Sequence, residues 1–210
     1  MRLEALAVTL PEVVDHPNRV NFEGVLTLID EPSNRAPSGA RGHRVILTRA
    51  AAAAALPSLI GMAVDYAPGW DGHDARRKCG IILQADVDGS RLRVSGYLFA
   101  KDFPEVEQQV TRTPGSMGMS YELANAHVAD MNAAVWTLTR ATFTGAAILL
   151  REKAAYRGTS FQLAARRCRT AGIAATAHPG GNSGGASGHT QRPGPRHAWP
   201  IEKGMEKRWN

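Results

Sequence analysis

Apolar and polar residues alternate along several stretches of the chain, and this pattern predicts a domain built mostly from strands. Residues 91–99 alternate most regularly, as expected for a strand with one buried face. Residues 78–86 form a second apolar run, and the Asp-Gly pair between the two runs favours a tight turn, so we expect a hairpin. Two more β-rich runs, at 21–29 and 43–48, are also predicted strands.

A second pair of long strands is predicted over 117–130 and 135–150, on either side of a short turn. The period of two in a strand places Gly118 and Ser120 on one face of the first arm and points Met119 towards the core. This arm therefore presents a polar face that contains serine.

Three segments depart from the strand pattern. Thr48 can cap a helix over 49–56, where a run of alanines supplies high helix propensity. Residues 102–110 predict a second short helix, and 151–163 predict a final helix or an irregular strap. Many strands with two or three short helices define an α+β, mainly β domain, for which we expect a closed or nearly closed barrel.

Length and composition fit one globular domain with additional tails. The chain has 210 residues, of which 43% are hydrophobic. The longest apolar stretch, 50–56, is too short to cross a bilayer. The N-terminus lacks the charged-then-apolar plan of a signal peptide, because acids and prolines interrupt it by Glu12. We therefore expect a cytoplasmic protein without membrane contact.

The C-terminal part differs in composition from the rest. From Thr170 to about Trp199 it is dominated by Gly, Ala, Ser, Pro and His, which cannot bury enough apolar surface to offset the entropy of ordering. We predict a folded domain over 1–167 and a flexible, basic Gly/Pro/His-rich tail over 168–210. The net charge of +6 lies in the segment from Arg166 onward, which carries eight bases and two acids. A basic tail on a neutral body indicates acidic partners, and nucleic acid is expected to bind weakly at most, through the tail.

Common cofactor motifs are missing from the sequence. It contains no GxxxxGK[ST], GxGxxG, HExxH or paired CxxC motif. Cys79 and Cys168 are too few for a disulfide framework or a four-ligand zinc site, and Cys79 lies in an apolar run where we expect it to be buried. We therefore expect no cofactor and no metal.

Two features could carry chemistry. His73 lies in a polar loop and is expected to be reachable by solvent; the alternative is an ordinary loop histidine that is hydrogen-bonded to Asp74. Ser116 and Ser120 flank Gly118, whose lack of a side chain would let a peptide approach closely and would free backbone N–H groups to face an oxyanion. The alternative for the serines is the polar face of an amphipathic strand.

The order of these features extends over much of the chain. An apolar strand is followed by the His73 loop, by Gly80-Ile81, by the Asp-Gly hairpin, by a short helix and by Gly118-Met119-Ser120. This order, over approximately residues 20–165, resembles the prohead (capsid maturation) serine protease family of tailed phages. That family is related in fold to the herpesvirus capsid maturation protease. The resemblance implies a β-barrel of that kind, flanked by a few short helices.

The resemblance also implies a function. It implies a serine endopeptidase of phage capsid maturation that acts inside the assembling prohead in the host cytoplasm. Its substrates would be segments of the scaffold and the major capsid protein, with the protease itself as a further substrate, and a homo-oligomer is expected. His73 would be the base, with Ser120 or Ser116 as nucleophile. We favour Ser120, which follows Gly-Met and lies 47 positions after His73.

A third catalytic residue is not evident. The family places an acid or a histidine on the next strand, but the corresponding stretch, 142–148, offers only threonines. Glu122 and His127 could substitute from the serine's own strand. The sequence leaves open a Ser–His dyad and a degenerate, non-catalytic capsid assembly or scaffold protein of the same fold. A nucleic-acid-binding module ranks last, because the body is neutral and aromatic residues make up only 6% of the chain.

Overall fold

A computed structural model describes residues 6–7 and 16–164. The predicted tail over 168–210 lies outside the described residues, as do the ends of the predicted domain 1–167. Within the described part, no helix is long and apolar enough to cross a membrane.

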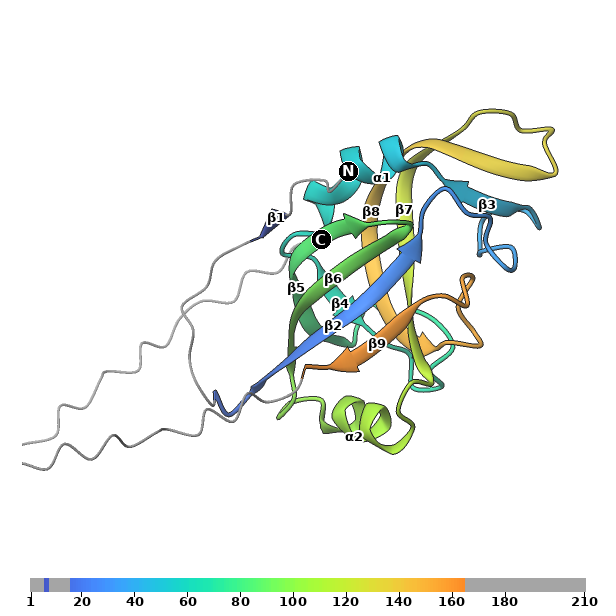
Figure 1. The fold of residues 1–210 in the computed structure, drawn as a ribbon. Coiled ribbons are helices and arrows are strands. Elements are labelled where there is room, and N and C mark those ends of the chain that lie inside the picture. Colours follow the sequence, from blue (N-terminus) through green and yellow to red (C-terminus); the bar gives the residue numbers. More distant parts are fainter. Residues whose placement is uncertain (1–5, 8–15, 165–210) are drawn as a thin grey trace, which may run out of the picture. The chain divides into compact units, whose positions relative to one another are not determined.

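The described part is mainly β, with one curled sheet that forms a half-barrel (Figure 1). The strands are β1 (Leu6–Ala7), β2 (Arg19–Leu28), β3 (Arg44–Leu47), β4 (Ala63–Asp65), β5 (Lys78–Asp88), β6 (Arg91–Phe99), β7 (Met117–Val128), β8 (Val135–Leu150) and β9 (Ser160–Leu163). The helical segments are α1 (Arg49–Ala55), the 3₁₀ helix η1 (Leu56–Leu59) and α2 (Pro104–Arg112). The strand order is β3-β8-β4-β5-β6-β2-β9, with β1 added to β5 and β7 added to β8.

Most predicted elements are confirmed. β5 and β6 form the expected hairpin, in which Gly89 takes a positive φ of 60° in the tight turn. β7 and β8 form the second, longer hairpin. The hydroxyl of Thr48 accepts a hydrogen bond from the backbone N–H of Ala51 at 3.2 Å, so Thr48 caps α1 as predicted.

The prediction for 151–163 was wrong in part. Turns occupy the first half of this stretch, and its end forms β9, which pairs with β2. The prediction of a closed or nearly closed barrel is also replaced by a half-barrel, because β7 and β9 are joined to other strands and not to each other.

The core fills the inside of the curl. Phe22 of β2 stacks on Phe161 of β9, with ring centroids 5.0 Å apart, and both rings are buried. Met119 of β7 packs against Gly24 of β2, where a Cβ would stand only 2.7 Å from its sulfur. The missing side chain at Gly24 thus lets β7 pass close to β2. Met119 points to the core as the alternation predicted, so Ser120 lies on the outer face of the sheet.

Candidate active site

The candidate site is built on the outer face of three adjacent strands, β4, β8 and β7. β4 runs parallel to β8 with Asp65 opposite Ala147, and β7 runs antiparallel to β8 with Ser120 opposite the same Ala147. Residues paired across a sheet point to the same face. Asp65 and Ser120 therefore flank Ala147 on one face, at a Cα separation of about 10 Å, which is two strand spacings.

His73 reaches this face from the loop between β4 and β5, residues 66–77. The carbonyl of Trp70 accepts a hydrogen bond from the N–H of Leu150 at 2.8 Å, and the Trp70 ring stacks on Tyr66 with centroids 4.9 Å apart. These contacts hold the loop against the end of β8. The Nδ1 of His73 then lies 3.3 Å from Oδ1 of Asp65, and only 18% of the His73 side chain is exposed.

Tyr66 ties the same loop to α2. Its hydroxyl donates to the carboxylate of Glu105, and Arg77 donates to the Tyr66 oxygen at 3.2 Å. Burial and the Glu105 carboxylate raise the pKa of Tyr66 above 10.0, so the phenol keeps its proton and remains a donor. The loop that carries His73 is therefore anchored at both of its ends.

Two expectations for His73 were wrong. Its side chain is largely buried, whereas the sequence predicted a residue reachable by solvent. The alternative partner, Asp74, accepts hydrogen bonds from the backbone N–H and the guanidinium of Arg76, at 3.0 and 3.1 Å. These bonds hold the pKa of Asp74 below 3.8. Because Asp74 is engaged in this local turn, His73 contacts the non-local Asp65.

Asp65 is a buried carboxylate, with 1% of its side chain exposed. Its Oδ2 accepts a hydrogen bond from Nζ of Lys78 at 2.6 Å, and its Oδ1 faces His73. Burial raises the pKa of Asp65, but the contacts with His73 and Lys78 outweigh burial and lower it below 3.8. Asp65 is therefore ionised at neutral pH and can stabilise a positive charge on the neighbouring imidazole.

Glu122 brings a second carboxylate close to the same imidazole. It follows Ser120 by two residues on β7, and its Oε2 lies 4.0 Å from Nδ1 of His73. Glu122 is paired with Gly145 of β8, and a Cβ at Gly145 would collide with the Glu122 carboxylate. Gly145 thus provides the space in which this carboxylate lies, while 56% of the Glu122 side chain remains exposed.

The two candidate serines differ in position. Ser120 is half-buried in the row with Asp65, whereas Ser116 lies before β7 begins, about 13 Å away along an extended chain. The hydroxyl of Ser116 donates to the carbonyl of Thr113 at 2.7 Å. Neither ring nitrogen of His73 is paired in an aligned hydrogen bond with any residue of 6–7 or 16–164, so no such bond joins it to either serine.

The space over Gly118 is not open to a peptide. A Cβ on Gly118 would lie 2.6 Å from Oγ1 of Thr159 and 3.0 Å from Cα of Arg151. The segment between β8 and β9 therefore packs directly on this glycine. This corrects the expectation that Gly118 leaves room for a substrate, because the chain itself fills that room.

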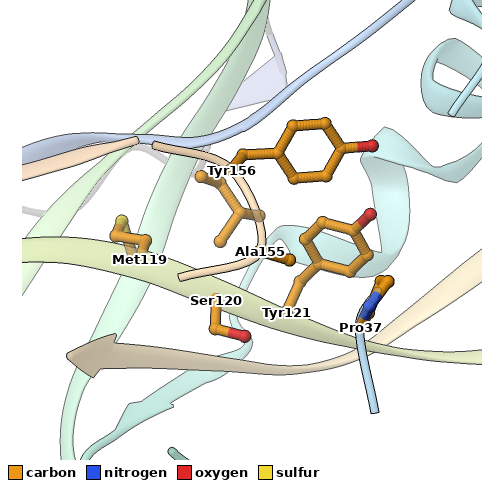
Figure 2. A pocket seen from close by; sticks show the side chains of 7 residues that line it. Pro37, Met119, Ser120, Tyr121, Ala155 and Tyr156 are labelled. Carbon is orange, nitrogen blue, oxygen red and sulfur yellow. The ribbon is translucent and has the colours of Figure 1, made fainter. Parts of the chain in front are cut away.

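A small cavity of about 30 Å³ lies beside Ser120, on the inner side of β7 (Figure 2). Figure 2 shows the Ser120 hydroxyl directed away from the rings of Tyr121 and Tyr156. The cavity has room for about one water molecule, which is too little for a peptide side chain of any size. Its lining comprises Leu26, Pro37, Met119, Ser120, Tyr121, Ala155 and Tyr156.

The other residues considered for a third catalytic role are exposed. Thr144, one of the threonines of 142–148, lies at a register shift of β8, and His127 lies opposite Arg140, seven residues beyond Ser120. Asp65 was missed. Its sequence signal is a single charge in the apolar run 61–66, since a charged residue in such a strand is rare unless it has a partner.

No protein-family model and no curated protein matches the chain. Among residues 6–7 and 16–164, no group of three or more His, Cys, Asp and Glu side chains is placed to hold a metal ion. What the chain does is therefore argued from the arrangement of Asp65, His73 and Ser120.

Proposed function

We propose that the chain is a serine endopeptidase, with Ser120 as nucleophile, His73 as general base and Asp65 as the residue that orients His73. The observation that carries this proposal is the buried, ionised Asp65, which lies 3.3 Å from His73 on the sheet face that also carries Ser120. A buried carboxylate that faces an imidazole, with a serine hydroxyl on the same sheet face, provides the three groups of a Ser-His-Asp catalytic triad.

Each residue has one task in the proposed reaction. Nε2 of His73 takes the proton from Oγ of Ser120 as that oxygen attacks the scissile carbonyl carbon. Asp65, facing Nδ1, stabilises the imidazolium that forms. His73 then gives the proton to the leaving amine. In the second half of the reaction His73 takes a proton from water as the water oxygen attacks the acyl carbon, and returns it to Oγ of Ser120 as the acid product leaves.

The reaction requires a small rearrangement on substrate binding. A general base must come within about 2.6–3.2 Å of the proton donor, and in ligand-free enzymes this distance is often longer. The serine and the histidine stand on separate elements, β7 and the loop 66–77, so a rotation of either side chain changes their separation. Ser120 is preferred over Ser116 because Ser116 lies four residues earlier in the chain, before β7 begins, and its hydroxyl donates to the carbonyl of Thr113.

The biological setting in this proposal rests on the resemblance to the prohead protease family. A curled, mainly β sheet with short helices is compatible with a herpesvirus-protease-like fold. The proposed substrates are segments of the phage scaffold and major capsid protein, and the protease itself. The proposed place of action is the assembling prohead, where confinement raises the local concentration of enzyme and substrate.

The test is co-expression of the chain with the major capsid and scaffold proteins, followed by intact-mass measurement. The variants are His73→Ala, Ser120→Ala and Ser116→Ala, the last serving as a matched serine control. Defined fragments that vanish with the first two variants and persist with Ser116→Ala are the expected result. Fragments that persist with Ser120→Ala would remove the assigned nucleophile.

One observation favours a second candidate, a non-catalytic capsid assembly or scaffold protein of the same fold. Neither ring nitrogen of His73 makes an aligned hydrogen bond to a serine in the described part of the chain. A fluorophosphonate probe separates the two candidates, because it modifies only an activated serine hydroxyl. Labelling of the wild type at Ser120, lost in His73→Ala, supports the protease; no labelling of folded wild type supports the assembly protein.

A further inference from the structure

We propose that Lys78 is a positioning residue of this site, which fixes the Asp65 carboxylate so that its free oxygen faces His73. This inference rests on the proposed function, since it concerns how the proposed base is oriented. Lys78 belongs to β5, outside the row of β4, β8 and β7 that carries the proposed catalytic side chains.

The sheet places Lys78 opposite Asp65 by an irregular register. β4 and β5 pair with Val64 opposite Gly80, so regular pairing would place Asp65 opposite Cys79. The register shifts by one residue at this point, and Asp65 instead lies opposite Lys78. Such a bulge redirects a side chain. The bulge places the ammonium group of Lys78, and not the buried thiol of Cys79, beside the buried carboxylate of Asp65.

The two oxygens of Asp65 then have separate partners. Nζ of Lys78 donates to Oδ2 at 2.6 Å, and Oδ1 lies 3.3 Å from Nδ1 of His73. With Oδ2 held, the carboxylate cannot turn about its terminal bond without losing a short, charge-assisted hydrogen bond. The orientation of Oδ1 favours the tautomer of His73 with the proton on Nδ1, which leaves Nε2 free to act as base.

Lys78 also balances the charge around the imidazole. Asp65 faces His73 from β4 and Glu122 faces it from β7, while Lys78 of β5 contacts Asp65. Lys78 thus offsets the charge of one of the two carboxylates beside the imidazole.

The first experiment compares kcat and KM of wild type with those of Lys78→Met, Lys78→Gln and Lys78→Arg. Lys101→Met, at an exposed position, is the matched control. We expect Lys78→Met to lower kcat by about 10- to 100-fold with KM nearly unchanged, because a misplaced catalytic group costs rate. Lys78→Arg should restore most of kcat.

The glutamine variant separates geometry from charge. Its uncharged amide can still donate to Asp65, so Lys78→Gln should retain more kcat than Lys78→Met. Lys78→Gln also serves as the second variant if a circular dichroism melt shows that Lys78→Met does not fold. Equal kcat for wild type and both variants would overturn the proposal.

The second experiment does not depend on proteolysis. ¹⁵N-labelled histidine reports the tautomer of His73, with His73→Ala used to assign its ring signals. The expected result is an Nδ1–H tautomer in wild type and Lys101→Met, and a lost or mixed tautomer in Lys78→Met. An unchanged tautomer in Lys78→Met would refute the role of Lys78. Cleavage that survives Ser120→Ala would refute the proposed function instead and leave this measurement valid.

Discussion

Replacing Gly118 with alanine tests whether the chain itself occupies the space beside the candidate nucleophile. The added methyl group would stand 2.6 Å from Oγ1 of Thr159 and 3.0 Å from Cα of Arg151. Ordinary van der Waals contacts of a Cβ begin near 3.4 Å, so Oγ1 of Thr159 must retreat by about 0.8 Å and Cα of Arg151 by about 0.4 Å. The Arg151 contact is with backbone, which cannot turn aside as a side chain end does.

The cost follows from what those atoms do in the native state. Thr159 is buried, and its hydroxyl donates to the carbonyl of Tyr156 at 3.0 Å, so its retreat strains a buried hydrogen bond. Overpacking of this kind lowers the free energy of unfolding by about 1–3 kcal/mol. Alanine also reduces the conformational entropy of the unfolded chain, which raises the free energy of unfolding by about 0.4–1 kcal/mol. With the strained hydrogen bond added, we expect Gly118→Ala to lower the free energy of unfolding by about 1–3 kcal/mol.

Urea denaturation and thermal melting measure this loss, which should lower Tm by about 2–4 °C for each kcal/mol. Gly72→Ala is the matched control, because nothing lies within 4 Å of a Cβ there and its φ is not positive. The control should be as stable as wild type or slightly more stable. If Gly118→Ala is equally stable and loses only proteolysis, the space belongs to the substrate and the packing argument is refuted.

Three further results are expected. Gly145→Ala should push the Glu122 carboxylate off β8, so a crystal structure should show it farther than 4.0 Å from the histidine, and an unmoved carboxylate would contradict this. The pKa of Asp65 is lowered below 3.8 by its histidine and lysine neighbours, although burial raises it. Urea titrations should therefore show the stability advantage of wild type over Asp65→Asn in full above pH 3.8 and shrinking below it, whereas a pH-independent advantage would disprove the assigned pKa. Burial raises the pKa of Cys79 to about 12, so peptide mapping after maleimide treatment at pH 8 should find Cys79 unmodified in the folded protein and modified in urea.

The predicted elements that were confirmed depend on short-range signals. The Asp-Gly turn at Gly89 and the threonine cap at Thr48 each act within a few residues, and alternation along β6 spans nine. These signals are visible in a sequence because they do not depend on distant parts of the chain. β9 was missed because four residues carry little periodicity and its pairing with β2 lies about 140 positions away.

The candidate site was predicted only in part for the same reason. His73 and Ser120 stand out by residue type, but the partner of His73 is set by the parallel pairing of β4 with β8, which joins Asp65 to Ala147. No local pattern encodes that register. Asp74, next to His73 in the sequence, was the partner considered from the sequence. Its carboxylate instead accepts hydrogen bonds from Arg76.

The central position of β8 has a consequence for when the site can exist. The strand that joins β4 to β7 ends at Leu150, later in the chain than every residue proposed to react. A chain is synthesised from its N-terminus, so Asp65, His73 and Ser120 all leave the ribosome before the strand that brings them together. A chain that ends before β8 therefore contains every group proposed to react but not the strand that brings them together. The candidate site can form only after β8 has been synthesised.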